Sequence, residues 1–220
     1  MLLNAVALGH MSRAEDCIQV VQQIERNLHI YDAQLQEDIK TQLDVQKCSI
    51  SMMLDNVSDA TKYFNADLEL LPEFTRGMTD NIQGYSHLAL GNFEQARKHL
   101  ERARALHFSS RSSFGLVYSD CFMSLMALMQ GDLPRARDAF EYTNRLFSEI
   151  PFNARAEATK NVLLAAIDYE MNRESEHLRN LQSNLELMQQ LGHISLIQVA
   201  YTTLARYMSK QAMQTWAWMP

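Results

Sequence analysis

The sequence predicts an all-α fold, a right-handed superhelix of antiparallel helix pairs, from three observations. First, residues 81–106 form one helix-turn-helix unit, because Gly91 suits the left-handed conformation that ends a helix. Second, small residues at Gly84, Ala96 and Ala103 allow the two helices of the unit to pack closely. Third, the 220 residues include only 7 Gly and 4 Pro, which leaves little room for sheets joined by tight turns.

The same unit recurs along the chain. Its turn position is occupied in successive copies by Gly9, Asp55, Gly91, Gly131 and Asn172. The position five residues later is Ala14, Ala60, Ala96 and Ala136, and becomes His177 in the last, degenerate copy. Copies at this spacing predict a tetratricopeptide-like solenoid of about five repeats.

Turn signals and apolar periodicity divide the repeats into helices. The expected helical segments lie at about 14–29, 34–54, 73–106 (two helices), 116–130, 133–147, 153–171, 174–191 and 195–210, with a further short helix before Pro72. The serine-rich stretch 108–115 is the most loop-like part of the chain. Asp132 is a suitable N-cap for the helix that follows it.

One repeat domain is expected over residues 1–210, followed by a tail or improvised cap over 211–220. The first copy begins in the middle of a helix, and the helix at 195–210 has no second helix after it. Because solenoids need polar caps at both ends, we expect the sequence to be a piece of a larger protein. The alternative is that Met213, Trp216 and Trp218 fold back as a cap.

Composition narrows the class of protein. The formal net charge of -6 argues against general affinity for nucleic acid. Cys17, Cys48 and Cys121 lack the spacing of a zinc site and are expected to be buried, reduced thiols. An export signal and a long apolar run are both missing from the sequence, which predicts a cytoplasmic location.

Three stretches resemble the sensor superhelix of MalT-like regulators, the ATP-dependent LuxR-type transcriptional activators. The three stretches are LELLPEFTRGMTDNIQGYSHLALGNFEQARKHLERARAL, FGLVYSDCFMSLMALMQGDLPRARDAF and YEMNRESEHLRNLQSNLELMQQLGHISLIQVAYTTLARYM. The resemblance covers nearly the whole chain, and its specific features are the repeat period, the LLP ending before an arginine and the Tyr-Glu-x-Asn segment.

This resemblance implies a superhelix that senses a small-molecule inducer or a regulatory protein. It also implies, as partners, the nucleotide-binding and DNA-binding domains of the same full-length protein. The chain itself has no G-x-x-x-x-G-K-[ST] phosphate loop and no DNA-reading helix-turn-helix, so neither ATP hydrolysis nor DNA binding carries over. We therefore expect no cofactor in this chain, no direct nucleic-acid contact and no membrane association.

A binding surface is expected on the concave face, which the first helix of each repeat would line. Tyrosines with neighbouring amides and hydroxyls would suit a sugar or another small polar inducer. The candidate residues are Gln42, Ser49, Met78, Asn81, Tyr85, Tyr118, Cys121 and Thr159. The alternative is that these are partly exposed packing residues.

Other candidate sites have weaker support. Glu174, Glu176 and His177 lie close together but lack the H-E-x-x-H spacing of a metal site. The main basic cluster consists of Arg97, Lys98, Arg102, Arg104 and Arg111. Glu94 and Glu101 are interleaved with it at helical spacings that allow ordinary ion pairs. Because there is no nucleophile–base pattern, an enzyme is not expected. The rival to a sensor is a stand-alone tetratricopeptide adaptor that binds a partner peptide.

Overall fold

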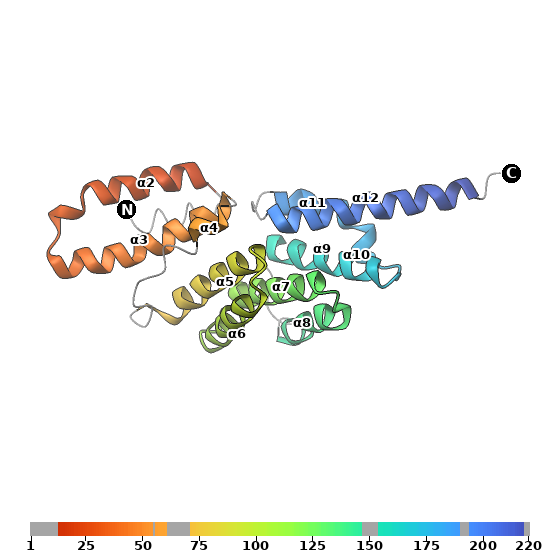
Figure 1. The fold of residues 1–220 in the computed structure, drawn as a ribbon, viewed down its shortest axis with the longest axis horizontal. Helices are drawn as coiled ribbons and strands as arrows, with labels where there is room; N and C mark the ends of the chain where they lie inside the picture. Colours follow the sequence, from red (N-terminus) through yellow and green to blue (C-terminus); the bar gives the residue numbers. More distant parts are fainter. Residues whose placement is uncertain (1–12, 55, 61–70, 147–153, 190–193, 218–220) are drawn as a thin grey trace. The chain divides into compact units, whose positions relative to one another are not determined.

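The computed structural model describes residues 13–54, 56–60, 71–146, 154–189 and 194–217. Within these ranges the chain is helical with no strand, and the helices pack as antiparallel neighbours, which confirms the predicted all-α solenoid class. The chain divides into two compact units, Met1–Gly115 and Leu116–Pro220. That residues 1–210 form one repeat domain stays a prediction. The two units are described separately (Figure 1).

The first unit is built from helix pairs. Its elements are α2 (Ala14–Arg26), the 3-10 turn η1 (Leu28–Ile30), α3 (Ala33–Met53), α4 (Val57–Ala60), α5 (Glu73–Ala89) and α6 (Phe93–Ser109). Asp32 caps α3, because its carboxylate accepts a hydrogen bond from the Leu35 amide at 2.9 Å. α5 lies at the centre of the unit, in contact with α3, α4 and α6.

The second unit contains most of α7 (Ser113–Met129), then α8 (Leu133–Leu146), α9 (Ala154–Glu170), α10 (Glu176–Arg179), α11 (Leu181–Met188) and α12 (Ile194–Ala217). The carboxylate of Asp132 accepts from the Arg135 amide at 3.1 Å, which confirms the predicted N-cap of α8. α9 occupies the centre of this unit and contacts α8, α10, α11 and α12.

One repeat position sets how closely the two helices of a pair approach. Cys48, Gly84 and Ser124 lie at this position in successive repeats, each twelve residues before the repeat alanine. The Cys48 thiol donates to the Ala60 carbonyl at 3.0 Å, and the Ser124 hydroxyl donates to the Ala136 carbonyl at 2.7 Å. At Gly84 a Cβ would lie 2.5 Å from the Leu100 side chain, so only glycine fits that crossing.

The predicted turn residues adopt the expected backbone conformation. Gly91 and Gly131 have φ angles of 77° and 75°, and Asn172 in the degenerate repeat has a φ of 53°. Positive φ is tolerated by glycine and, to a lesser degree, by asparagine. The prediction is therefore confirmed at these three turns, whereas Gly9 and Asp55 lie outside the described residues.

Several predicted boundaries were wrong. The expected loop at 108–115 is only a short turn, because α6 continues to Ser109 and α7 begins at Ser113. The expected helix at 174–191 is divided at Asn180 into α10 and α11. The first helix ends at Arg26, and η1 takes up the remaining residues.

The end of the chain also differs from the expectation. α12 runs without a break to Ala217, so residues 211–217 extend the last helix, and Met213 is exposed on it rather than folded back as a cap. The expectation for Trp218 falls outside the described residues.

The three cysteines are buried free thiols, as predicted. Burial raises the pKa of each thiol, so none is activated as a thiolate. No helix in the described part of the chain is long and apolar enough to span a membrane.

Candidate functional site

The predicted binding residues separate into two groups in the structure. Gln42, Ser49 and Met78 are half-buried. The other five are buried in the packing between helices rather than on an exposed concave surface: Asn81, Tyr85, Tyr118, Cys121 and Thr159. Ligand binding by these residues stays a prediction. The side chains of the second group, however, are not exposed on a surface as expected.

The second group of predicted binding residues is buried because of where the first helix of each repeat lies. α5 and α9 are each surrounded by several other helices of their own unit, so more than one face of each helix is covered. Asn81 illustrates the result, because its side-chain amide donates to the Gly115 carbonyl at 3.0 Å and is used within the fold. A ligand could reach such residues only after neighbouring helices move apart.

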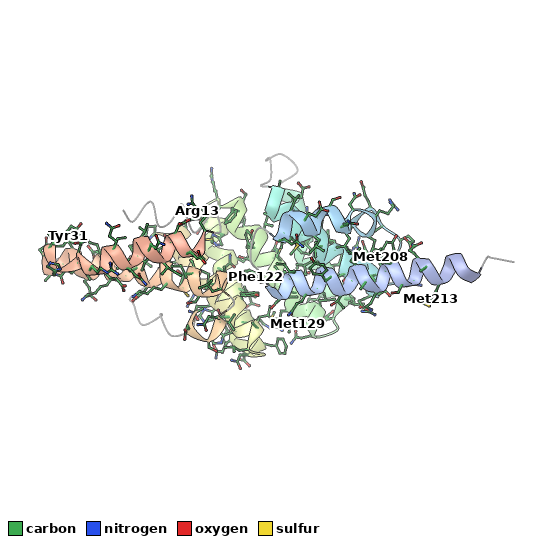
Figure 2. The ribbon with its side chains drawn as sticks, turned by 90° about the horizontal axis from the view of Figure 1, so that it is seen from above. Arg13, Tyr31, Phe122, Met129, Met208 and Met213 are labelled. Carbon is green, nitrogen blue, oxygen red and sulfur yellow. The ribbon has the colours of Figure 1, made fainter. Side chains whose placement is uncertain are left out.

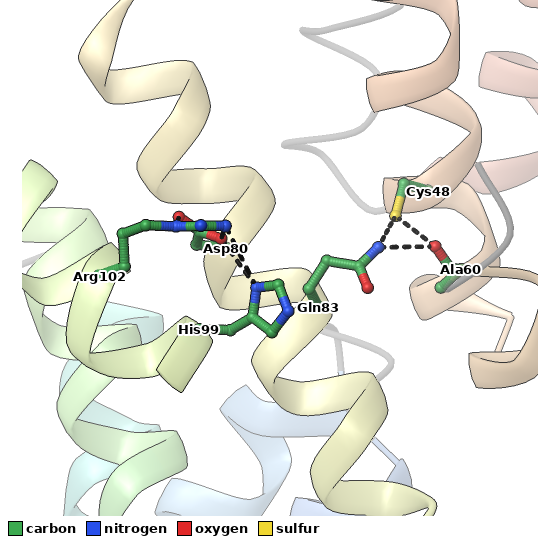
Figure 3. A network of polar contacts seen from close by, with 6 residues as sticks. All are labelled: Cys48, Ala60, Asp80, Gln83, His99 and Arg102. Carbon is green, nitrogen blue, oxygen red and sulfur yellow. Dashed lines mark hydrogen bonds and ion pairs between the residues drawn. The ribbon is translucent and has the colours of Figure 1, made fainter. Parts of the chain in front are cut away.

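The most concentrated charged site in the first unit is centred on Asp80 of α5 (Figure 3). The side chain of Asp80 is only 2% exposed, and both of its partners come from α6. His99 Nδ1 lies 2.9 Å from one carboxylate oxygen, and Arg102 Nε donates to the other at 2.5 Å. A second guanidinium nitrogen also bonds the carboxylate, so the arginine is bidentate, the strongest geometry for this pair.

A second polar site in the same unit joins three helices (Figure 3). Gln83 of α5 donates its amide to the Ala60 carbonyl at 3.0 Å, and its nitrogen lies 3.9 Å from the Cys48 sulfur. The Ala60 carbonyl therefore accepts from both Cys48 of α3 and Gln83 of α5. This shared acceptor fixes α4 against both neighbours.

The second unit contains a comparable charged site around Asp168 of α9. Its side chain is 3% exposed and lies between Arg137 of α8, at 2.5 Å, and His177 of α10, at 3.1 Å. Burial alone would raise the pKa of Asp168, but hydrogen bonds from Ser175, His177 and Arg137 more than offset this effect and lower it. The carboxylate is thus held in its charged form.

His107 of α6 is a fully buried titratable group of the first unit. Its imidazole is fully buried between Gly77 of α5 and Gly115, where an added Cβ would lie 2.7 Å and 2.2 Å from ring atoms. The Phe74 ring packs against it edge-on, with ring centroids 5.8 Å apart. Both glycines are therefore required to make room for this ring.

The imidazole of His107 is kept neutral by its surroundings. Neither ring nitrogen makes a hydrogen bond with a described residue. Burial lowers the pKa of His107 from 6.5 to about 4; the nearby Gly77 backbone and the Asp80 charge offset only part of this effect. The Gly77 backbone lies close to the ring, but not in a geometry that bonds either nitrogen.

These arrangements are contacts between neighbouring helices. In the described part of the chain, no three metal-binding side chains come together, and His177, singled out from the sequence, bonds Asp168. An ion pair at the expected helical spacing forms between Lys98 and Glu94 at 3.1 Å, and Arg102 pairs with Asp80 of α5.

Sequence reasoning missed the buried aspartates. A signal for them exists, because Asp44, Asp80 and Asp120 recur at the spacing of the repeat alanines Ala60, Ala96 and Ala136. Asp80 and Asp120 are both buried, so this position accepts a carboxylate in the interior of two consecutive repeats. The partners of Asp80 lie 19 and 22 residues away, too far in sequence for a local pattern to reveal.

No protein-family model matches the chain, and no curated protein or solved structure shows significant similarity to it. The functional proposal therefore rests on the residues and their contacts.

Proposed function

We propose that this chain is a signal-sensing and protein-interaction superhelix of the kind used by bacterial MalT-like, LuxR-type transcriptional activators. It would act in the cytoplasm and bind a small-molecule inducer or a regulatory protein. Support comes from the recurring helix pairs and from the sequence resemblance across most of the chain. The partners to which it would transmit the signal are the nucleotide-binding and DNA-binding domains of a full-length regulator.

The observation that best supports this proposal is that the first helices of the repeats bury many polar side chains. α5 alone buries five polar side chains within one short segment: Thr79, Asp80, Asn81, Gln83 and Ser86. α7 and α9 repeat this feature, with Ser119, Asp120 and Ser124 on one and Thr159 and Asp168 on the other. Networks of buried hydrogen bonds between helices, such as those of Asn81, Gln83 and Asp168, can carry coupling between sites when the helices have two discrete arrangements.

A sensor needs two arrangements that its ligand distinguishes. A ligand shifts the equilibrium only by the difference between its affinities for the two states. Tyr85 and Asn81 are buried in the present arrangement, so a ligand that contacts them would favour a state in which α5 is less tightly covered. Met78, half-buried on the same helix, is the residue of this set that a ligand would reach first.

Thermal unfolding of the intact chain in the presence of candidate inducers tests the proposal. The panel contains sugars, sugar phosphates, aromatic and aliphatic acids, and nucleotides. A ligand at one hundred times its Kd stabilises the native state by about 2.7 kcal/mol, which gives a measurable rise in Tm. We expect Tyr85→Phe, which removes one buried hydroxyl, to weaken this response.

Tyr31→Phe is the matched control, because Tyr31 is an exposed tyrosine of the same unit. Its ligand response should equal that of the wild type. A hit whose affinity is the same in both variants would contradict a site at Tyr85. The absence of any hit, together with the absence of a bound regulatory protein, would overturn the sensor proposal.

The adaptor alternative is favoured by a different observation. Ile30, Tyr31 and Leu35 form an exposed apolar group where α2 turns into α3. Such a group fits the apolar side chains of a partner peptide. A partner retained by the wild type and lost by Ile30→Asp, with no small-molecule response, would support the adaptor.

A further inference from the structure

The last helix, α12, has one face packed and one face open. Leu196, Ala200 and Thr203 are buried on the side that meets α9 and α11. On another side runs a stripe of apolar residues, here named the α12 stripe. It consists of Ile197, Tyr201, Leu204, Met208 and Ala212. The spacing of four, three, four and four residues places all five on one face of the helix.

The α12 stripe is accessible over about four turns. Tyr201 is 50% exposed and Met208 is 60% exposed, while Ile197 and Leu204 are half-buried. Figure 2 labels Met208 on this helix, together with Met213 five residues further on. Exposed apolar residues in a continuous row, rather than scattered singly, mark an interaction surface.

Charge is confined to the other side of α12. Among residues 194–217 the only charged side chains are Arg206 and Lys210. Arg206 bonds the Glu170 carboxylate and lies over the Tyr169 ring, 4.7 Å from its centroid. Lys210 Nζ lies 2.6 Å from the side-chain oxygen of Asn172. Both cations are therefore directed towards the end of α9, which leaves the α12 stripe without a charged residue.

We propose that the α12 stripe binds the same stripe of a second copy of this chain, as an antiparallel helix pair around a two-fold axis. A two-fold interface brings one surface against itself, so a charged residue close to the axis would face its own copy. The formal net charge of the chain is -6, so two copies repel each other at long range. The uncharged stripe adds no local charge repulsion to this.

The side chains of the stripe also match each other in the antiparallel direction. An axis between Leu204 and Ala205 places Tyr201 opposite Met208 and Ile197 opposite Ala212, so each large residue meets a different or smaller one. Interdigitation of large and small residues is the arrangement that fills helix interfaces well. Opposed helix dipoles add a small favourable contribution.

The pair would be a weak dimer that depends on protein concentration. The stripe spans fifteen residue steps, about 22 Å of helix, and one helix pair of this length is a small interface. This self-association is separate from the proposed sensing function, because it uses α12 and needs no ligand. Either proposal can fail without the other.

Sedimentation equilibrium of the intact chain over a wide concentration range tests the proposal. We expect a reversible monomer–dimer equilibrium for the wild type. Met208→Glu would bring two carboxylates into the apolar interface and raise the dimer Kd by about tenfold or more. Met213→Glu is the matched control, because Met213 is an equally exposed methionine, 66% accessible, about 140° around the helix from Met208.

The outcomes are distinct. A monomeric wild type at every concentration would overturn the proposal and leave the stripe to a different partner. Equal effects of Met208→Glu and Met213→Glu would also overturn it, because the dimer would not depend on the stripe. Unchanged helical circular dichroism in both variants excludes unfolding as the cause.

Cysteine cross-linking tests the direction of the pair. A mixture of Tyr201→Cys and Met208→Cys chains should form mixed disulfides more readily than either chain forms with itself, because the antiparallel register brings these positions together. The native thiols are buried and do not compete. Preferential self-cross-linking of each variant would contradict the antiparallel arrangement.

Discussion

His107 in the first unit and Asp168 in the second are both buried, but these two sites accommodate an ionisable group in opposite ways. His107 sits between two glycines with no hydrogen bond to a described residue, and burial keeps its imidazole neutral. Asp168 is held charged by Arg137, His177 and Ser175. One site removes the charge, whereas the other surrounds it with donors.

The difference shows what each site contributes to stability. A neutral buried ring stabilises the fold through its packing only while it stays unprotonated. A charged carboxylate with several donors stabilises the fold by joining helices, here α8, α9 and α10. Acid should therefore weaken the first unit before it weakens the second.

The largest expected effect is the response of His107 to pH. The unfolded chain binds a proton at His107 below pH 6.5, whereas the folded protein does so only near pH 4. Stability therefore falls as pH falls through this window, by about 3 kcal/mol for the gap of 2.5 pKa units. Denaturant unfolding of wild type and His107→Leu at pH 7 and pH 4 measures it.

The loss between these pH values should be smaller in His107→Leu than in the wild type. By contrast, Asp168 has a lowered pKa, so its contribution is present above its ordinary value of 3.8 and is lost only at lower pH. An equal loss of unfolding free energy in both proteins between pH 7 and pH 4 would show that His107 does not cause the pH dependence.

The second prediction concerns the charged site of the second unit. Asp168→Ala should destabilise the protein by about 2 kcal/mol, because it leaves the donors of two other helices without their common acceptor. The partial exposure of Arg137 and His177 allows them to rehydrate and limits the loss. His177→Ala, which leaves Arg137 in place, should have a smaller effect on the unfolding free energy at pH 7. The reverse order would contradict a central role for Asp168.

The third prediction tests the glycines around His107. Gly115→Ala should destabilise the protein by about 1 kcal/mol net, because overpacking against the ring exceeds the gain in helix propensity. In a His107→Ala background, where the obstructing ring is absent, the same substitution should become neutral or stabilising. A double-mutant cycle of unfolding free energies measures this coupling. Additive effects would show that the ring does not require the glycine.

The smallest change in stability is expected at an exposed ion pair. Lys98→Met, which breaks the exposed ion pair with Glu94, should change stability by less than about 0.5 kcal/mol. Arg102→Met on the same helix leaves the buried Asp80 without its bidentate partner and should cost about 1 to 2 kcal/mol. Equal losses of stability from both substitutions would show that burial of the carboxylate does not determine the size of the loss.

Local features of the fold could be predicted from the sequence. The turns at Gly91 and Gly131 depend on a backbone conformation that few residues adopt, and the repeat alanines depend on close helix contact. Boundaries were harder, as the stretch at 108–115 shows. Its serines and glycine suggested a loop, but Gly115 serves instead to accommodate His107.

The charged sites could not be predicted, because their members come from different helices. Asp80 lies 19 and 22 residues from its partners, and Asp168 bonds an arginine 31 residues away. Burial of the predicted binding residue Tyr85 has the same origin, since it follows from the number of helices packed around α5. Periodicity identifies a helix face, but not how many neighbours cover it.

The most direct test of this contrast between the units is an NMR titration of the His107 ring protons from pH 8 to pH 4.5. The structure predicts that their chemical shifts stay nearly constant over most of this range, since His107 titrates only near pH 4 in the folded protein. A titration with a midpoint near 6.5 in the folded state would show that the ring is hydrated. That result would contradict the enclosed, neutral site between Gly77 and Gly115.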